Sequence, residues 1–323
     1  MLIFSLVVAL LALDSAALGA SISGQRHRVR TVATFPADID PENLVVRHSG
    51  QILMTASNQN KLYQIDPWGR TKPIVLHTFD GHMSVTGIDE VEKDVFVATV
   101  GNFSFATFTS TPQSFGLWKI DLRGTKPCVG KLFAIPELDV PNGLVYVGDN
   151  DILIADSHVG GIFRVNVHSG HPKLVDSNDP LMKSLPPDPS NPDLVGFGIN
   201  GIHLNPLNKH EIIFSSTDQN VIGKVGINQH FVPIGNATKV ADAVNDDLIP
   251  APNGDIHVAS NNAITTIYPG GSKSVFNFTT DAVRLTALKY GRTDPYKHSL
   301  FGTVIVFGET GTNTGKLIVV DNY

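Results

Sequence analysis

Six pairs of short apolar segments recur along the chain, one pair per about 50 residues, and this repeat restricts the possible folds more than any other feature. Each segment has six or seven residues, is rich in Val, Ile, Phe and Thr, and is bounded by Gly, Asn, Asp or Pro. The pairs are 51–56 with 61–66, 94–99 with 117–122, 151–156 with 162–167, 211–217 with 222–227, 255–260 with 263–268, and 303–308 with 316–321. This spacing is typical of the blades of a β-propeller.

Further strands complete these units. One apolar strand precedes each pair, over 43–47, 84–88, 143–147, 201–204, 247–249 and 287–290, and a fourth follows most pairs, for example at 73–78, 131–135, 173–176 and 274–278. The sixth unit has no fourth strand, whereas Arg28–Phe35 has strand character and no unit of its own. We therefore predict an all-β, six-bladed β-propeller in which Arg28–Phe35 supplies the outer strand of the last blade and closes the ring.

The first twenty residues have the pattern of a secretory signal peptide. An apolar run from Leu2 to Leu13 is followed by mostly small residues that end in Ala17-Leu18-Gly19-Ala20. A membrane anchor is the alternative, but a span needs about 20 apolar residues. We expect residues 1–20 to be removed and 21–323 to form one propeller domain. The mature protein is then expected in the secretory-pathway lumen or outside the cell, without a membrane span.

Charge and composition exclude several classes of partner. The chain has 30 acidic and 24 basic residues, a formal net charge of −6, which argues against nucleic acid or an anionic membrane as a partner. The single cysteine, Cys128, cannot form an internal disulfide, and its apolar surroundings predict a small buried side chain. N-glycosylation sequons at Asn102, Asn236 and Asn277 are expected on the surface. We expect a monomer.

Four oxygen-bearing side chains occupy the same position in four of the repeats. Glu42, Asn142 and Asp246 each lie ten residues before the isoleucine that opens the next strand. Asn200 lies twelve residues before its own, a difference that a two-residue loop insertion explains. Because the first strand of each propeller blade lines the central channel, we expect these four side chains to face one mouth of the channel.

Two carboxylates and two amides around one axis suggest a site for a hard divalent cation such as Ca²⁺ or Mg²⁺. The two negative charges would balance the cation and would be costly to bury unpaired. The alternative is that Asn and Asp here are ordinary turn residues before strands, although Glu42 is a poor turn residue. The same register points to Val85 in the second blade, and Thr286 is the best match in the sixth.

Two histidines are candidate catalytic residues because of their positions. His82 comes just before the first strand of the second unit, and His158 follows the end of a second strand at Asp156-Ser157. Histidine is the most frequent general base near neutral pH, although most of the 12 histidines here are expected to be structural or solvated. The sequence has no G-x-S-x-G motif, no phosphate-binding glycine loop and no H-E-x-x-H motif.

The chain resembles the SMP-30/gluconolactonase/LRE-like six-bladed propellers, and within them a fungal secreted branch. The resemblance is carried by Pro41–Pro67, Ser84–Ser104, Pro141–Gly170, Gly198–Leu204 and Ala287–Asp294. It implies a divalent cation, often Ca²⁺, held at the positions that match Glu42, Asn142, Asn200 and Asp246. Lactonases of the family usually have Glu-Gly-Pro at the first ligand, whereas this chain has Glu42-Asn43-Leu44.

Some fungal propellers of this kind are hetero-Diels–Alderases of secondary metabolism, which join a tropolone quinone methide to a sesquiterpene such as humulene. The resemblance then implies an enzyme whose pocket orients two hydrophobic reactants without a nucleophile. The Phe-rich insertion 101–116 offers an apolar wall for a terpene, or is a glycosylated surface loop. We expect such a pericyclase; the alternatives are a divalent-metal-dependent lactone hydrolase and a non-catalytic propeller that binds a small ligand.

Overall fold

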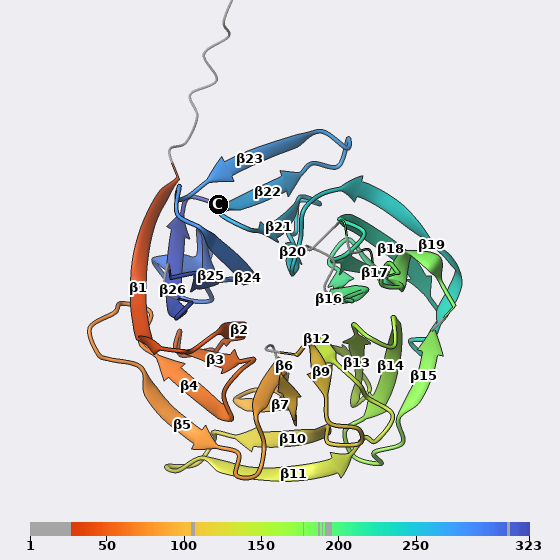
Figure 1. Cartoon of the computed structure of the whole chain (residues 1–323), viewed down its shortest axis with the longest axis horizontal. Coiled ribbons are helices and arrows are strands. Elements are labelled where there is room, and N and C mark those ends of the chain that lie inside the picture. Colours follow the sequence, from red (N-terminus) through yellow and green to blue (C-terminus); the bar gives the residue numbers. More distant parts are fainter. Residues whose placement is uncertain are drawn as a thin grey trace, which may run out of the picture.

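A computed structural model of the chain describes residues 27–104, 107–176, 178–186, 188, 190, 196–308 and 311–323. The predicted signal peptide lies outside these residues. The structure is a ring of six four-stranded antiparallel sheets around a central axis (Figure 1), which confirms the six-bladed propeller. Among the described residues, no helix has the length and apolar character needed to cross a membrane.

Blades 1 to 5 each run from the innermost to the outermost strand in chain order. Blade 1 comprises β2 (Pro41–Val46), β3 (Ile52–Ala56), β4 (Lys61–Ile65) and β5 (Ile74–Thr78); blade 2 comprises β6 (Ser84–Glu92), β7 (Val95–Gly101), β10 (Gly116–Asp121) and β11 (Cys128–Ala134); blade 3 comprises β12 (Pro141–Gly148), β13 (Asp151–Asp156), β14 (Gly161–Asn166) and β15 (Lys173–Asp176). Blade 4 comprises β16 (Ile199–Asn205), β17 (Asn208–Ser216), β18 (Val221–Ile227) and β19 (Pro233–Asp242); blade 5 comprises β20 (Leu248–Pro250), β21 (Ile256–Ser260), β22 (Ala263–Ile267) and β23 (Lys273–Asn277).

The amino-terminal strand completes blade 6, as predicted. That blade consists of β24 (Val283–Tyr290), β25 (Ser299–Val306), β26 (Thr314–Asp321) and β1 (Arg28–Ala37), and β1 pairs antiparallel with β26 along its outer edge. The last blade is therefore built from both ends of the described chain (Figure 1). This pairing covers an edge that would otherwise expose a row of unpaired backbone groups.

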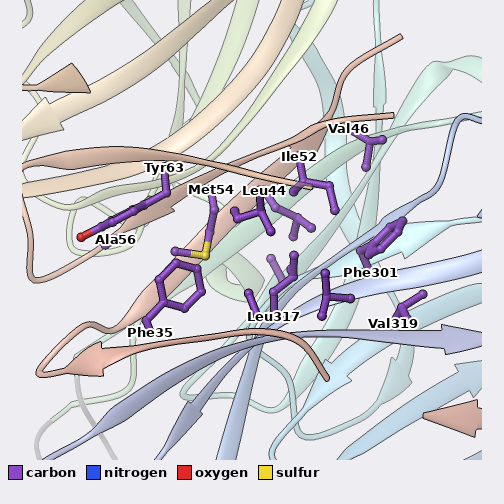
Figure 2. Close-up of a cluster of buried hydrophobic side chains, with 14 of the residues drawn as sticks. Phe35, Leu44, Val46, Ile52, Met54, Ala56, Tyr63, Phe301, Leu317 and Val319 are labelled. Atoms are coloured by element: carbon purple, nitrogen blue, oxygen red, sulfur yellow. The ribbon is translucent and has the colours of Figure 1, made fainter. Parts of the chain in front are cut away.

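The core consists of apolar layers between adjacent blades. At the seam between blades 6 and 1, Phe35 and Leu317 face Leu44 and Met54 (Figure 2), and all four side chains are buried. Similar clusters fill the other seams, because each strand directs alternate side chains toward the neighbouring blades. Because Cys128 is the only cysteine, no internal disulfide can form, and this core accounts for the stability of the domain.

The prediction that Cys128 is buried is wrong. Cys128 is a free, exposed cysteine that opens β11, the outermost strand of blade 2. Most of β11 is exposed or half-buried, because an outer strand has a partner strand on one edge only and packs little of its surface against the next blade. The apolar sequence around Cys128 therefore reflects strand formation and not burial.

Buried hydroxyl groups connect neighbouring blades close to the channel. Thr303 Oγ1 in blade 6 donates to the Glu42 carbonyl of blade 1 at 2.7 Å, and Ser215 Oγ in blade 4 donates to the Asp246 carbonyl of blade 5 at 2.6 Å. Thr55 makes the equivalent bond to the Thr86 carbonyl at 2.7 Å. These hydroxyls also accept backbone N–H groups of their own inner strands, so they fix the inner strands relative to one another.

We expect Thr303→Val to lower the free energy of unfolding by about 1–3 kcal/mol, because the Ala287 N–H that Thr303 accepts would stay buried without a partner. Urea unfolding followed by circular dichroism measures the change. Thr31→Val is the matched control, since Thr31 is an exposed strand residue, and we expect it to change stability by less than about 0.5 kcal/mol. Equal effects of the two substitutions would contradict this role of Thr303.

Candidate active site

The predicted ring residues lie in β-bulges of the inner strands. The register between the first two strands of a blade shifts between Pro41 and Leu44 in blade 1, and at the corresponding places in blades 3 and 4. Glu42 lies inside the first of these bulges, and Asn142 and Asn200 lie inside the other two. A bulge turns side chains away from the regular alternation of a strand and is frequent beside active sites. These three are thus strand residues and not turn residues before strands.

The structure corrects the register of blade 2. Gly87 N–H donates to Thr99 Oγ1 in the way that Asn43 N–H donates to Thr55 Oγ1, so Thr86 occupies the position of Glu42. Val85 is fully buried in the core instead. The one-residue error arises because the ten-residue spacing has to be counted from Phe96 and not from Val95, since Glu90 pairs with Phe96 as Val46 pairs with Ile52.

Blade 6 contributes Thr286, as expected from the sequence. The Thr286 hydroxyl contacts the Pro41 and Glu42 carbonyl oxygens at 3.0 Å each, so it joins blade 6 to the first ring residue. Thr86 is likewise buried, with its hydroxyl 2.8 Å from that of Thr99. All six blades therefore place an oxygen-bearing side chain at this level: Glu42, Thr86, Asn142, Asn200, Asp246 and Thr286. In blade 5 that residue lies two positions before the inner strand β20.

The structure brings the four predicted ligand candidates together at one end of the channel. Asn200 Nδ2 donates to Asp246 Oδ1 at 3.0 Å and to Thr217 Oγ1 at 3.0 Å. The Glu42 carboxylate accepts a hydrogen bond from Asn142, and it lies close enough to Asp246 for the two carboxylates to interact electrostatically. Glu42, Asn142 and Asn200 are buried and Asp246 is half-buried.

Burial and mutual repulsion make the two carboxylates hard to ionise. Burial, and then the negative charge of Asp246, raise the pKa of Glu42 well above its usual value. Burial raises the pKa of Asp246 to about 6, against the lowering effect of Arg284 and of the Asn200 hydrogen bond. The Arg284 guanidinium, which lies over the Phe307 ring, also lowers the pKa of Glu42. The site therefore favours positive charge, and Arg284 supplies only part of it.

The residues present fit a hard divalent cation. Asn200 Oδ1 is buried and has no hydrogen-bond partner, although its Nδ2 donates twice, so the amide presents one oxygen that needs a donor or a cation. Within the described ranges, no group of three or more His, Cys, Asp and Glu side chains is arranged to hold a metal ion. A cation here would therefore depend on two carboxylates and two amides, which is oxygen chemistry suited to Ca²⁺ or Mg²⁺.

The two candidate histidines lie in different places. His82 packs edge-on against Trp118 of the third strand of blade 2, at a ring distance of 5.7 Å, and burial lowers its pKa. This position is apart from the carboxylates, and His82 Nδ1 is buried without a partner. His158 lies in the turn between β13 and β14, where Nδ1 is 3.4 Å from Asp139 Oδ2. That turn is at the same end of blade 3 as Asn142, because Pro141 pairs with Asp156.

The Phe-rich insertion contributes aromatic side chains beside His158. It contains a short hairpin of β8 (Phe103–Ser104) and β9 (Thr109–Ser110), and Phe105 lies outside the described residues. Phe103 is buried and Phe108 is partly exposed. Both rings are near Phe197, at 5.9 and 6.1 Å between centroids, and the expected apolar wall therefore includes a side chain from outside the insertion.

The three sequons differ in exposure. Asn236 and Asn277 are exposed on the outer strands β19 and β23, where a glycan has room. Asn102 is half-buried, and its Oδ1 is buried without a hydrogen-bond partner. Glycosylation stays a prediction at all three positions, and Asn102 is the least accessible of them.

Solved structures with the same architecture include a calcium-binding protein and two enzymes. A calcium-binding protein, regucalcin from Agrobacterium tumefaciens, has a TM-score of 0.63 and 13% identity, with 92% of this chain and 95% of that chain covered. A luciferin-regenerating enzyme has a TM-score of 0.65 and 10% identity, covering 92% and 95%. A gluconolactonase from Xanthomonas campestris has a TM-score of 0.60 and 12% identity, covering 91% and 89%.

These similarities establish the fold and leave the activity to be argued from the site. No protein-family model and no curated protein matches the sequence. The sequence analysis missed Thr86, Arg284 and the partner of His158, Asp139. Thr86 could have been found from the shared pattern of an apolar residue two positions after each ring residue, which is Leu44 in blade 1 and Ile88 in blade 2.

Proposed function

We propose that the protein is a divalent-cation-dependent hydrolase of lactones or related cyclic esters, in the SMP-30/gluconolactonase-like group of propellers. The observation that carries this proposal is the pair of carboxylates, the buried Glu42 and the half-buried Asp246, beside the unpartnered Asn200 Oδ1. A gluconolactonase and a calcium-binding regucalcin among the structures with this fold give further support. Of the functions expected from the sequence, the lactonase is better supported than the pericyclase.

Each ring residue has a defined task in this proposal. A bound cation would polarise the lactone carbonyl and stabilise the negative charge that develops on its oxygen. Glu42 and Asp246 supply the two charges that hold the cation, and the Asn142 hydrogen bond orients the Glu42 carboxylate. Thr217 and Asp246 fix the Asn200 amide so that its Oδ1 faces the site. The burial of these groups strengthens their electrostatic effect on a substrate.

Hydrolysis of a lactone panel in the presence of Ca²⁺, Mg²⁺ or Mn²⁺ tests this function. We expect activity on at least one lactone, and we expect a chelator to lower it by at least about 100-fold, because the substrate carbonyl would lose its main electrostatic partner. Addition of excess cation should restore the rate. If the chelator had no effect on the rate, the protein would be a hydrolase that does not use the proposed cation. Inactivity on the whole panel would reject the function.

The second candidate is the hetero-Diels–Alderase-like coupling of a tropolone quinone methide with a sesquiterpene, as in the fungal branch. The exposed ring of Phe108, which packs against the buried Phe197, favours it, because it offers an apolar contact to a terpene. Incubation with such a precursor and humulene tests it. A product ratio and a diastereomer distribution equal to those of the enzyme-free reaction would reject it. Specific binding of a small ligand without turnover of either substrate class would leave a non-catalytic binding propeller.

The proposed setting is a eukaryotic secretory pathway. The signal-peptide pattern of residues 1–20, together with exposed sequons at Asn236 and Asn277, supports export of a glycoprotein. We propose that it acts as a monomer on a small hydrophobic substrate. Expression of the full chain in a fungal host tests this. The protein is expected in the medium, with a mass that falls after glycosidase treatment.

A further inference from the structure

We infer that Asp139 and His158 form an oriented general-base pair at the channel mouth, and that the adjoining aromatic side chains select substrates with a flat apolar substituent. This inference deepens the proposed function and rests on it for the reaction concerned. The pair is distinct from the ring of candidate cation ligands. Three features of the molecule support it: the position of the pair, the contacts that hold each partner, and the rings that surround the imidazole.

The pair lies where blades 3 and 4 meet, the two blades that contribute Asn142 and Asn200 to the ring of candidate cation ligands. Asp139 lies three residues before Asn142 in the segment that enters blade 3. His158 follows Ser157, whose hydroxyl donates to the Ile199 carbonyl at 2.9 Å and whose carbonyl accepts the Gly198 N–H at 2.9 Å. The pair therefore stands at the seam between blades 3 and 4, at the end of these blades that carries Asn142 and Asn200.

Asp139 is held so that it can orient the imidazole. Its backbone N–H donates to Asp156 Oδ2 at 2.8 Å, and its Oδ1 accepts a hydrogen bond from the Ser110 hydroxyl. The second oxygen, Oδ2, is left to face His158 Nδ1 at 3.4 Å. A carboxylate at Nδ1 favours the tautomer with hydrogen on Nδ1, and this leaves Nε2 with a free lone pair.

His158 Nε2 points to the side of the ring away from Asp139. It lies beside Gly196, where an added Cβ would be 3.9 Å away, so this glycine leaves room at Nε2. Within the described part of the chain, no residue hydrogen-bonds Nε2. The His158 side chain is 19% exposed, so water can reach an imidazole that is otherwise enclosed.

Aromatic rings enclose the imidazole and indicate the kind of substrate. The Phe103 and Phe197 centroids lie 6.2 and 5.5 Å from that of His158, and Phe108 packs at 6.1 Å from Phe197. Phe103 and Phe197 are buried, so Phe108, which is 38% exposed and packs against Phe197, is the ring of this cluster that a substrate can contact. Such a ring binds a flat apolar group by contact with its face, and it gives nothing to a polyhydroxylated sugar lactone. An aryl-substituted or aryl-fused lactone fits this surface.

The reaction step balances with water as the only co-reactant. His158 Nε2 takes one proton from a water molecule while the water oxygen bonds to the lactone carbonyl carbon. The ring C–O bond then breaks, and the departing alkoxide takes the proton back from the imidazolium, which yields the hydroxy acid. Asp139 acts as a positioning residue that stabilises the imidazolium during the step.

Kinetics of His158→Gln, Asp139→Asn and wild-type protein with dihydrocoumarin test the pair. We expect kcat to fall at least about 100-fold in His158→Gln and less in Asp139→Asn, with KM and the affinity for Ca²⁺ within about threefold of wild type. Imidazole in the buffer should partly restore His158→Ala. His168→Gln is the matched control, because His168 is an exposed histidine at the opposite end of blade 3. Wild-type rates in His158→Gln would overturn the pair and leave the hydrolase standing.

Two further measurements separate the pair from the proposed function. Nitrogen-15 NMR of the histidine side chains reports the tautomer without any turnover; we expect the Nδ1–H form for His158, lost in Asp139→Asn, and an Nε2–H form would overturn the pair. Phe108→Ala is expected to lower kcat/KM about tenfold for dihydrocoumarin and to spare δ-valerolactone. An equal loss on both lactones would overturn the aromatic selectivity. A wild-type protein inert to all lactones would reject the hydrolase, and NMR would then decide the pair alone.

Discussion

Replacement of Asp246 by Asn is expected to lower lactone hydrolysis by at least about 1,000-fold and to weaken Ca²⁺ binding by a similar factor. The substitution keeps the hydrogen bond with Asn200 Nδ2 possible while it removes one of two charges that face the site. A site built from one carboxylate and amides holds a divalent cation far less tightly, since the charge of its oxygen ligands sets much of the affinity. Glu42→Gln is expected to have the same effect, because Glu42 is the other charge.

Steady-state kinetics over a range of Ca²⁺ concentrations, with calorimetric titration of the cation, measures both losses. Asp242→Asn is the matched control: Asp242 lies four residues earlier, is exposed, and pairs with Lys239 at 2.9 Å. It changes the net charge by the same amount, so it reports any effect of charge alone. If Asp246→Asn kept the Ca²⁺ affinity and the rate of the control, the ring would be part of the pocket wall and not a cation site.

The fold could be predicted from the sequence because every blade repeats the same local pattern. Strand 173–176 was expected with the bounds that β15 has, and the role of Arg28–Phe35 followed from counting strands per repeat. Strand patterns of this kind depend on residues close together in the chain, so they can be recognised without knowledge of the tertiary structure. The buried ring positions Glu42, Asn142 and Asn200 followed from the same periodicity.

Features that depend on contacts between blades could not be obtained in this way. The ring position of blade 2 is Thr86 and not Val85, because the pairing of β6 with β7 makes Phe96, and not Val95, the counterpart of Ile52; the ten-residue spacing alone does not decide between these two apolar residues. The exposure of Cys128 depends on the start of the outer strand β11, which begins three residues before the predicted strand 131–135 and so includes Cys128. The partner of His158 is nineteen residues away at Asp139, and only the folding of blade 3 brings the two together.

The free energy of unfolding is expected to depend on pH differently in wild type and in Asp246→Asn. The pKa of Asp246 is raised to about 6 in the folded protein, from 3.8 in the unfolded chain, because burial disfavours the charged form. A raised carboxylate pKa contributes stability that is fully present below about pH 3.8 and is lost as the pH rises through about 6. Without a cation, ionised Asp246 therefore destabilises the folded protein at neutral pH by about 3 kcal/mol.

Other groups act in the opposite direction, so wild type alone does not isolate this effect. Burial lowers the pKa of His257 to about 4, and burial also lowers the pKa of His203. The contributions of both groups to stability grow as the pH rises toward about 6.5. These histidines are unchanged in Asp246→Asn. We therefore expect the stability of Asp246→Asn relative to wild type, both in chelator, to increase by about 2 kcal/mol between about pH 4 and pH 7.5.

A bound cation should reverse this difference at neutral pH. It binds the ionised carboxylates of the folded state, and at a hundred times its Kd it stabilises that state by about 2.7 kcal/mol. At acid pH, protons on Glu42 and Asp246 compete with it, so Ca²⁺ is expected to stabilise wild type at pH 7.5 and hardly at about pH 4.5, and Asp246→Asn at neither. Urea unfolding of both proteins at each pH, in chelator and in saturating CaCl₂, measures these changes. Stabilisation of Asp246→Asn by Ca²⁺ to the wild-type extent would place the cation elsewhere on the protein.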